Sequence, residues 1–495
     1  MVVLTKIKKR LYQDSLKLMR VSAEIKEMPG IEQAFAFMAT EINKKTRMQE
    51  SLMGNDVLAA GSDDLVLLVE ADNEASGQEA LEQFEKKISS STASLQKDNS
   101  GNYSEALPTT FEQGKAYIDA NLAVISVPGP YAAVQAMTAL SQNMNVLLFS
   151  DNVSIEEEIT IKDFAAKKGL IVMGPDCGTA IINGVPLCFA NVVKRGKIGV
   201  IGASGTGMQE LTVLLDSAGC GIAHAIGTGG RDLSKEVAGR TALSALKLLE
   251  QDPNTEIIAI ISKPPAQSVA DKVIEAVKAI GKPAVLAFLG ATTNKIADNI
   301  YIAGTIEEAA AKITAIHKGN NPEETTVLYE RKPIDNILVE ASKLITSQKT
   351  IKGLYTGGTL ASEAKHILVG LNADVIDLGD DEYTRGALHP MIDPTKRGQF
   401  VMQAFSDDTI GVVLCDVVIG YGSHPDPAFE LAKDIKAARE KYGLHKIVIA
   451  SVTGTENDPQ VKSVQIKKLE DAGIFVFSSN QYAAEVAKSL SESIA

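Results

Sequence analysis

The segment from Lys197 to Gly207, KIGVIGASGTG, has the residue types of an anion-binding loop. A short apolar run ends there in a turn of small residues, and an amphipathic helical pattern follows at once. Gly205 and Gly207 allow a ligand to approach the backbone closely, and Ser204 or Thr206 can cap the helix. Because the first N–H groups of a helix lack internal partners, this loop predicts a site for a phosphate or carboxylate.

Three further loops of this kind follow apolar runs later in the chain, where open α/β sheets place their ligands. They are Thr356–Thr359, with Gly357 and Gly358; Gly420–Pro425, with Gly420, Gly422 and Ser423; and Thr453–Pro459, with Asn457. Ser423 is expected to cap a helix. None of the loops has the spacing G-x-G-x-x-G or G-x-x-x-x-G-K-S/T of a nucleotide site. A purely structural interpretation stays open, since any tight strand-to-helix turn needs small residues.

Two histidines lie beside groups that could take part in acid–base chemistry. His424 lies in the loop GYGSHP, and His389 lies in TRGALHPMIDPTKR together with Arg385 and Arg397. Histidine can act as a general acid or base near neutral pH, and arginine binds planar carboxylates and phosphates. His389, His424 and Arg385 are therefore candidate catalytic residues, and Arg397 is a candidate substrate ligand. The alternative is a structured loop with solvated charges.

The four cysteines predict neither a metal site nor covalent catalysis. Cys177, Cys188, Cys220 and Cys415 lack the spacing of metal ligands, and no Cys–His or Ser–His pairing is visible by spacing. They are expected to be reduced thiols in a cytoplasmic protein.

Charge and hydropathy exclude several classes of partner. The chain of 495 residues has a formal net charge of −13, which argues against a nucleic-acid-binding surface or a basic membrane patch. No apolar stretch approaches the roughly 20 residues of a membrane helix. The start, MVVLTKIKKRLYQDS, has no long apolar segment after its charges, so it is not expected to be a signal peptide.

The order of apolar runs predicts an α/β protein of several domains. Residues 1–92 alternate short strands and helices, as in a small ferredoxin-like α+β domain, and a polar linker follows. From about residue 105, near-continuous apolar runs alternate with helical patterns, which is typical of doubly wound parallel sheets. We expect three Rossmann- or flavodoxin-like units, at residues 105–191, 192–318 and 330–495.

Several segments resemble the α subunit of succinyl-CoA synthetase. They are MGPDCGTAIINGVP at 173–186, the SGTG loop, and AIGTGGRDLS at 225–234. Residues 330–495 resemble the ligase domain of that enzyme's β subunit. The whole chain, with TRGALHPMIDP and TGTENDPQ, resembles the FdrA family of acyl-CoA synthetase-like proteins.

Two departures from the ligases matter for function. Those enzymes carry a catalytic histidine in a G-H-A-G-A segment after a KP-x-V strand, whereas residues 294–305 here read NKIADNIYIAGT. No histidine lies between His224 and His317, so the phosphohistidine carrier is missing. The early glycine-rich CoA loop and the nucleotide-binding module of the β subunit are missing too. The resemblance therefore implies no firm cofactor and disfavours CoA.

What remains is expected to be a phosphate clamp made by the SGTG and GYGSHP loops as opposed helix N-termini. The FdrA family is linked to carbamoyl transfer between oxamate and carbamoyl phosphate in allantoin and purine catabolism. The resemblance thus implies a transferase subunit in which backbone N–H groups hold phosphate. Arg385 or Arg397 would hold the oxamate carboxylate, and His389 or His424 would move the proton.

Partners and alternatives follow from the same resemblance. We expect a small anionic substrate, and assembly with other transferase subunits or as a homodimer. One alternative is an acyl-CoA synthetase, or succinate–CoA ligase-like enzyme, that binds CoA. Another is a regulatory or scaffold protein whose N-terminal domain senses a small ligand.

Overall fold

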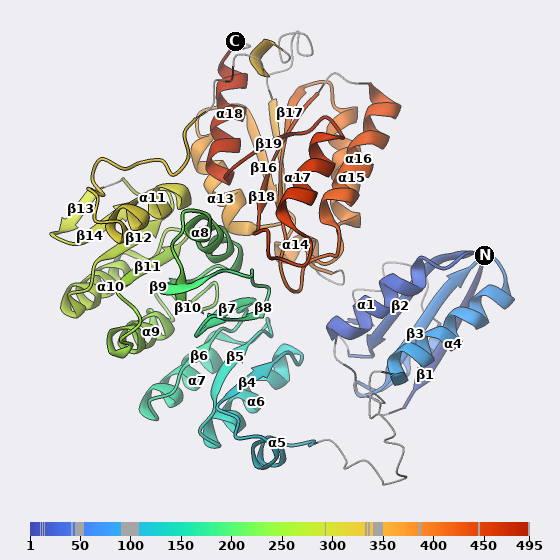
Figure 1. Ribbon diagram of the computed structural model, residues 1–495. Coiled ribbons are helices and arrows are strands. Elements are labelled where there is room, and N and C mark those ends of the chain that lie inside the picture. The colour runs from blue at the N-terminus through green and yellow to red at the C-terminus, as the bar shows by residue number, and fades with distance from the viewer. Residues whose placement is uncertain are drawn as a thin grey trace, which may run out of the picture. The chain divides into compact units, whose positions relative to one another are not determined.

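A computed structural model describes most of the chain (Figure 1). It describes residues 1–495 except positions 10, 12, 14, 41, 42, 45–53, 91–107, 293, 332, 333, 335, 336, 340–349, 385–387, 444, 445, 494 and 495. These residues form two compact units. The first comprises Met1–Ala120, Ser126–Ala132 and Thr384–Leu388; the second comprises Asn121–Ile125, Ala133–Tyr383 and His389–Ala495.

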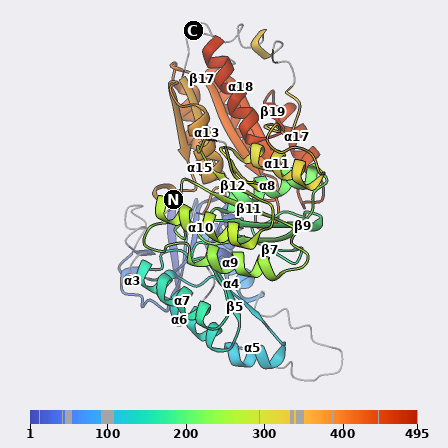
Figure 2. The same cartoon turned by 90° about the vertical axis from the view of Figure 1, so that its left-hand side faces the viewer.

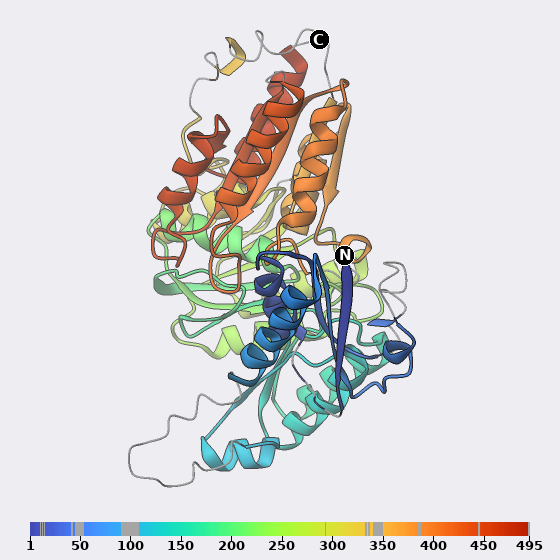
Figure 3. The ribbon, with the colours of Figure 1, turned by 90° about the vertical axis from the view of Figure 1, so that its right-hand side faces the viewer.

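The N-terminal part is an α+β layer with an antiparallel sheet in the order β1-β3-β2. Helices α1 and α4, blue in Figure 3, bury Leu18, Ile25 and Phe84 against one face of that sheet. The order confirms the predicted small α+β domain, and among the described residues it matches three of the four strands of the ferredoxin-like fold. Its elements are β1 (Val2–Lys8), α1 (Ser15–Lys26), β2 (Ile31–Met38), α3 (Asn55–Leu58), β3 (Leu65–Ala71) and α4 (Glu74–Ser90), and α5 (Phe111–Tyr117) follows.

The second unit contains an eight-stranded sheet in the order β13-β14-β12-β11-β9-β10-β7-β8. Its five central strands, from β14 to β10, are parallel. Helices connect β9 to β10, β10 to β11 and β11 to β12, whereas the antiparallel strand β13 lies between β12 and β14 along the chain. The strands are β7 (Thr179–Ile182), β8 (Val185–Cys188), β9 (Arg195–Gly202), β10 (Ile222–Gly227), β11 (Ile257–Ser262), β12 (Ala284–Phe288), β13 (Asn294–Ala297) and β14 (Ile300–Ala303).

Helices cover both faces of this sheet, which confirms the predicted doubly wound style. Helices α9 (Arg240–Gln251) and α10 (Gln267–Ile280) pack on the face turned to the viewer in Figure 2. Helices α8 (Gly205–Ser217) and α11 (Ile306–His317) pack on the other face. Every residue of β11 is buried, as expected for a central parallel strand.

A smaller parallel sheet in the order β4-β5-β6 precedes the eight-stranded sheet along the chain. Its elements are β4 (Leu122–Ile125), α6 (Gly129–Ser141), β5 (Asn145–Leu148), α7 (Ile155–Lys167) and β6 (Val172–Met173). Strands β7 and β8, which lie inside the predicted 105–191 unit, pair in the eight-stranded sheet rather than here. The predicted domain boundaries themselves stay a prediction.

The C-terminal part is a five-stranded parallel sheet in the order β16-β15-β17-β18-β19. Helices α13 and α18 cover one face, and α15, α16 and α17 cover the other (Figure 1). The elements are β15 (Thr350–Tyr355), α13 (Gly358–Ile367), β16 (Ala373–Asp377), α14 (Asp381–Thr384), α15 (Thr395–Ser406), β17 (Ile410–Val418), α16 (Pro427–Tyr442), β18 (Ile447–Thr453), α17 (Lys462–Glu470), β19 (Phe475–Phe477) and α18 (Asn480–Ser493). Among the helices described, none combines the length and the apolarity needed to cross a membrane.

One hydrophobic core joins the two large sheets, because α8 and α11 pack against α13 and α18. Buried Glu363 of α13 connects α11 and α18 within this core. Its Oε1 atom accepts from the Ile306 backbone N–H, and its Oε2 atom accepts from Asn480 Nδ2, both at 2.7 Å. Burial raises the pKa of Glu363 from 4.5 to about 8, and the nearby Glu210 and Glu307 carboxyls also raise it.

This carboxyl predicts a pH-dependent stability. Because the folded state keeps the Glu363 proton up to about pH 8 and the unfolded chain loses it near 4.5, the free energy of unfolding should fall as pH rises across that window. Glu363→Gln should flatten the fall, since an amide can still bond to Asn480. Urea unfolding between pH 5 and 8 measures the slope, and exposed Glu470→Gln is the control. Equal slopes in wild type and Glu363→Gln would contradict the assignment.

Candidate functional site

The predicted anion loop lies between β9 and α8. Ser204 is the N-cap residue of α8, in an extended conformation with φ −138° and ψ 132°, and its side chain makes no capping bond to the helix. The Ser204 hydroxyl instead bonds to the Thr359 hydroxyl. The first turn of α8 contains no acidic residue, so no acidic side chain of its own turn offsets the positive end of the helix dipole. This terminus suits an anionic ligand.

The loop Thr356–Thr359 begins α13 and differs from α8 in its electrostatics. Asp416 of β17, which is fully buried, accepts the backbone N–H groups of Thr356 and Gly357, each at 2.7 Å. The Asp416 carboxylate thus occupies the position that an anionic ligand would take. Gly357, which lies in one of the loops predicted to bind a ligand, has its N–H group already engaged.

The first turns of α8 and α13 contact each other where the eight-stranded and five-stranded sheets pack together. A Cβ atom built on Gly207 would lie 2.8 Å from Thr359 Cγ2, and one built on Gly357 would lie 3.0 Å from the Thr206 Cβ. Only glycine permits contacts this close. The sequence predicted that the SGTG loop faces GYGSHP, whereas these contacts pair it with TGGT.

The GYGSHP loop does not itself begin a helix, so the prediction that Ser423 is a cap was wrong. Helix α16 begins at Pro427, and the Asp426 carboxylate accepts from the Phe429 N–H at 3.3 Å. Asp426 caps the helix instead of Ser423, because the chain continues in a loop through Pro425 before the helix begins. The Ser423 hydroxyl is buried without a hydrogen-bond partner among the described residues.

Glycines 420 and 422 of this loop let it pack against residues 189–191. The Tyr421 N–H donates to the Ala190 carbonyl at 2.9 Å, and a Cβ atom on Gly422 would lie 2.8 Å from the Phe189 ring. Both glycines have positive φ angles, of 123° and 79°. In this structure they serve close packing of the loop.

The two candidate histidines lie in one loop cluster. The His424 N–H donates to the Met391 carbonyl at 2.7 Å, and the Met391 N–H donates to His389 Nδ1 at 3.2 Å. Burial lowers the pKa of His389 from 6.5 to about 4, so its ring is neutral at pH 7. The His389 ring also lies beside Phe189, with 6.3 Å between ring centroids. His389 therefore suits hydrogen bonding better than charge stabilisation.

The other candidate residues lie apart from this cluster. Arg397 is buried inside the C-terminal part, where its Nη1 atom donates to the Asp416 carbonyl at 2.7 Å and lies 3.7 Å from Asp416 Oδ1. Asn457 is exposed on its loop. Arg385 lies outside the described residues.

Sequence reasoning missed two carboxylates at this edge of the C-terminal sheet. Asp416 is the one charged residue within the apolar run IGVVLCDVV, a signal that could have identified it as a buried polar group with a partner. Asp377 ends β16, and its Oδ1 atom accepts the Gly379 N–H at 2.9 Å. Burial raises the pKa of both carboxyl groups.

The four cysteines were predicted to be reduced thiols. All four are free thiols. Burial raises the pKa of Cys177 and of Cys415 to about 12, and that of Cys188 to about 11, so these three groups are protonated at neutral pH and are poor nucleophiles.

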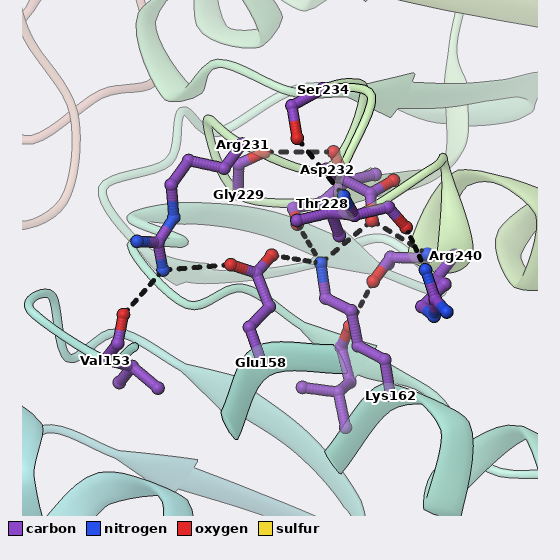
Figure 4. Close-up of polar contacts among 12 residues, drawn as sticks. Val153, Glu158, Lys162, Thr228, Gly229, Arg231, Asp232, Ser234 and Arg240 are labelled. Carbon is purple, nitrogen blue, oxygen red and sulfur yellow. Dashed lines mark hydrogen bonds and ion pairs between the residues drawn. The ribbon is translucent and has the colours of Figure 1, made fainter. Parts of the chain in front are cut away.

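The segment AIGTGGRDLS forms an ion-pair network that fixes α7 to the start of α9 (Figure 4). Lys162 Nζ lies 2.7 Å from Glu158 Oε1 and 2.8 Å from Asp232 Oδ1, and Arg231 lies 2.9 Å from Glu158 Oε2. Asp232 also accepts the Thr241 and Ala242 N–H groups at 2.9 Å. Because its carboxylate is fully engaged, this network holds the scaffold together.

Comparison with known proteins places the chain in a family. It is 39% identical over 502 residues to the uncharacterized protein YahF of Escherichia coli, with 96% of each chain covered. The chain belongs to the YahF family of succinyl-CoA synthetase-like proteins. The CoA-ligase family model matches residues 354–490 of this chain, and the CoA-binding-domain model matches residues 193–290. The model of the AllF heavy metal-associated domain matches residues 1–104.

More distant relatives share part of the chain. The α subunit of the succinate–CoA ligase of Aquifex aeolicus is 28% identical over 227 residues, which covers 43% of this chain and 73% of that subunit. Among solved structures, a dinucleotide-forming acetyl-coenzyme A synthetase 1 of Ca. Korarchaeum cryptofilum matches at 16% identity, over 76% of this chain and 84% of that one, with a TM-score of 0.30. Such a low score carries no functional weight.

The N-terminal domain does not fit the heavy metal of its family description. Residues 1–104 contain no cysteine and no histidine, which are the ligands that soft metals prefer. Met38 lies in the core of the domain and Met28 packs against it, so these thioethers are used for packing. No group of three metal-ligating side chains occurs in the part of the chain that the structure describes.

We therefore expect metal chelators to leave the protein unchanged. Dialysis against a Cu(I) or Zn(II) chelator should alter the melting temperature and the activity by no more than the error of measurement. Cys188→Ser removes the one cysteine that is not fully buried. Any metal that this variant still binds is therefore not held by the Cys188 thiol. Retention of one equivalent of metal by that variant would overturn the expectation.

Proposed function

We propose that the chain is a subunit of a transferase that moves a carbamoyl group between carbamoyl phosphate and oxamate, with oxalurate and phosphate as the other pair. The observation that carries the proposal is the start of α8. This helix starts after an extended Ser204 that does not cap it, and its first turn contains no acidic residue. The chain has no histidine between His224 and His317 to carry a phosphoryl group. A phosphate site without a carrier suits a substrate that brings its own phosphate.

In this proposal the first-turn N–H groups of α8 hold the phosphate and stabilise it as it leaves. Neutral His389 donates or accepts a hydrogen bond at the reacting group, with His424 beside it. Arg385 is the candidate for the oxamate carboxylate. Arg397 is assigned a positioning role instead, because its guanidinium is committed to Asp416. The FdrA-type resemblance supports the choice of oxamate, and partner subunits complete the enzyme.

A second candidate function is acyl-CoA synthesis, as in a succinate–CoA ligase. The matches to the CoA-ligase and CoA-binding-domain models favour it. A reaction of this kind transfers a phosphoryl group from a nucleotide to the acid before the thiol attacks. The chain would then need a phosphoryl carrier from a partner, or direct transfer to the acid.

Phosphorolysis of oxalurate distinguishes the two functions. The protein, purified with the subunits that accompany it, is mixed with oxalurate and inorganic phosphate, and carbamoyl phosphate is measured. The transferase proposal expects phosphate-dependent release of oxamate, and it expects no heat of binding when CoA is titrated into the protein. Absence of turnover together with saturable CoA binding would replace it with the ligase function.

A further inference from the structure

We infer that Asp377 is the general base of the transfer, the group that takes the proton from the attacking amide nitrogen of oxamate; this inference rests on the proposed function. Asp377 is the last residue of β16, at the carboxyl edge of the C-terminal sheet. Active-site groups of open α/β sheets lie at this edge.

Contacts bring Asp377 close to the proposed phosphate site. A Cβ atom on Gly358 would lie 2.4 Å from Asp377 Oδ2, so this carboxylate oxygen rests directly on the start of α13. The preceding residue, Gly357, has the same close relation to Thr206 in the first turn of α8, at 3.0 Å. Two glycines therefore separate the carboxylate from the helix turn that would hold the phosphate.

The two carboxylates at this edge differ in their availability. Asp416 binds two backbone N–H groups, the Thr356 hydroxyl and Arg397, so both of its oxygens are committed. Asp377 accepts one backbone bond, from Gly379, at its Oδ1 atom. A base needs an oxygen that can accept a substrate proton, and Asp377 Oδ2 is the better placed of the two.

The charges around Asp377 come from three elements. Lys263 faces it from the segment after β11, Asp416 from β17, and Asp380 from its own loop. The neutral His389 ring lies on the same side of Gly379 as Asp377, because a Cβ atom built on Gly379 would be 2.6 Å from His389 Nε2 and 3.2 Å from Asp377 Oδ1. Burial raises the pKa of Asp377, and the two carboxylates add to the rise while the Gly379 N–H and Lys263 oppose it. A raised pKa strengthens a general base.

The step balances without any further reactant. The amide nitrogen of oxamate attacks the carbonyl carbon of carbamoyl phosphate, the new N–C bond forms, and the C–O bond to phosphate breaks. The nitrogen proton passes to Asp377 and from there to the departing phosphate. The products are oxalurate and hydrogen phosphate, and Asp377 is returned to its ionised form.

The test compares Asp377→Asn with Asp374→Asn, a change on the same strand at an exposed residue that pairs with Lys352. Asp377→Asn should lower kcat by about 100-fold or more, the range expected for a lost general base. It should also abolish the fall of kcat at low pH, while calorimetric phosphate binding stays within about twofold of wild type. Asp374→Asn should match wild type in all three readouts.

Each other outcome counts against the inference. If Asp377→Asn keeps at least half of the wild-type kcat, Asp377 is not the base, although the proposed function stands. If phosphate binding falls as far as kcat, Asp377 only shapes the loop. If wild type itself shows no phosphate-dependent turnover, the proposed function fails and takes this inference with it.

Discussion

Phosphate binding should weaken by about 10- to 100-fold when the N–H group of Gly205 is removed, because a hydrogen bond to a charged group contributes about 1.5–3 kcal/mol. Gly205→Pro removes that donor. Gly205 is the first residue of α8, where proline is well tolerated, and the extended Ser204 before it suits a following proline.

The variant needs one compensating change. A Cβ atom at position 205 would lie 2.8 Å from Thr179 Oγ1, so Gly205→Pro is combined with Thr179→Ala. Thr179→Ala alone is the matched control. Isothermal calorimetry with inorganic phosphate gives the affinities, and circular dichroism checks that the helix content is kept. Equal affinities in the double variant and in its control would show that α8 does not hold the phosphate.

A second large effect is expected at Asp416. Asp416→Ala would leave the buried Arg397 guanidinium unpaired and the Thr356 and Gly357 N–H groups without an acceptor. Breaking a buried pair of this kind costs about 3–5 kcal/mol. Urea unfolding of the C-terminal sheet should register that loss.

Two further variants test whether the unpaired buried charge causes the lower free energy of unfolding of Asp416→Ala. Asp408→Ala, at an exposed acid in the turn before β17, should change the free energy of unfolding by less than about 0.5 kcal/mol. Combining Arg397→Met with Asp416→Leu should recover part of the stability, because the unpaired charge is gone. If Asp416→Ala costs less than 1 kcal/mol, as a surface change would, the carboxylate does not hold the start of α13.

The fold could be predicted well because buried parallel strands leave a strong signal. Runs such as EIIAIIS and KIGVIGA are typical of buried parallel strands, and the structure places β11 and β9 there. The turn from Gly202 into α8 could be predicted as well, since Gly205 and Gly207 precede an amphipathic helical pattern.

The pairing of loops could not be predicted in the same way. Which helix start meets α8 depends on how two sheets pack through α11, α13 and α18, and no local pattern encodes that. The roles of Asp416 and Arg397 depend on the same long-range packing. From the sequence, Arg397 was a candidate ligand for an anionic substrate. In the structure its side chain is buried and contacts Asp416 of β17, a residue that is distant from Arg397 in the local sequence pattern.

The central claim is that this chain acts on a free acyl phosphate and has no phosphohistidine. The most direct measurement incubates the purified complex with ³²P-labelled phosphate and oxalurate, and follows the label. The account predicts that label appears in carbamoyl phosphate as oxamate is released, and that no label stays on the denatured chain. Acid-labile label on this chain, with CoA-dependent discharge, would contradict it.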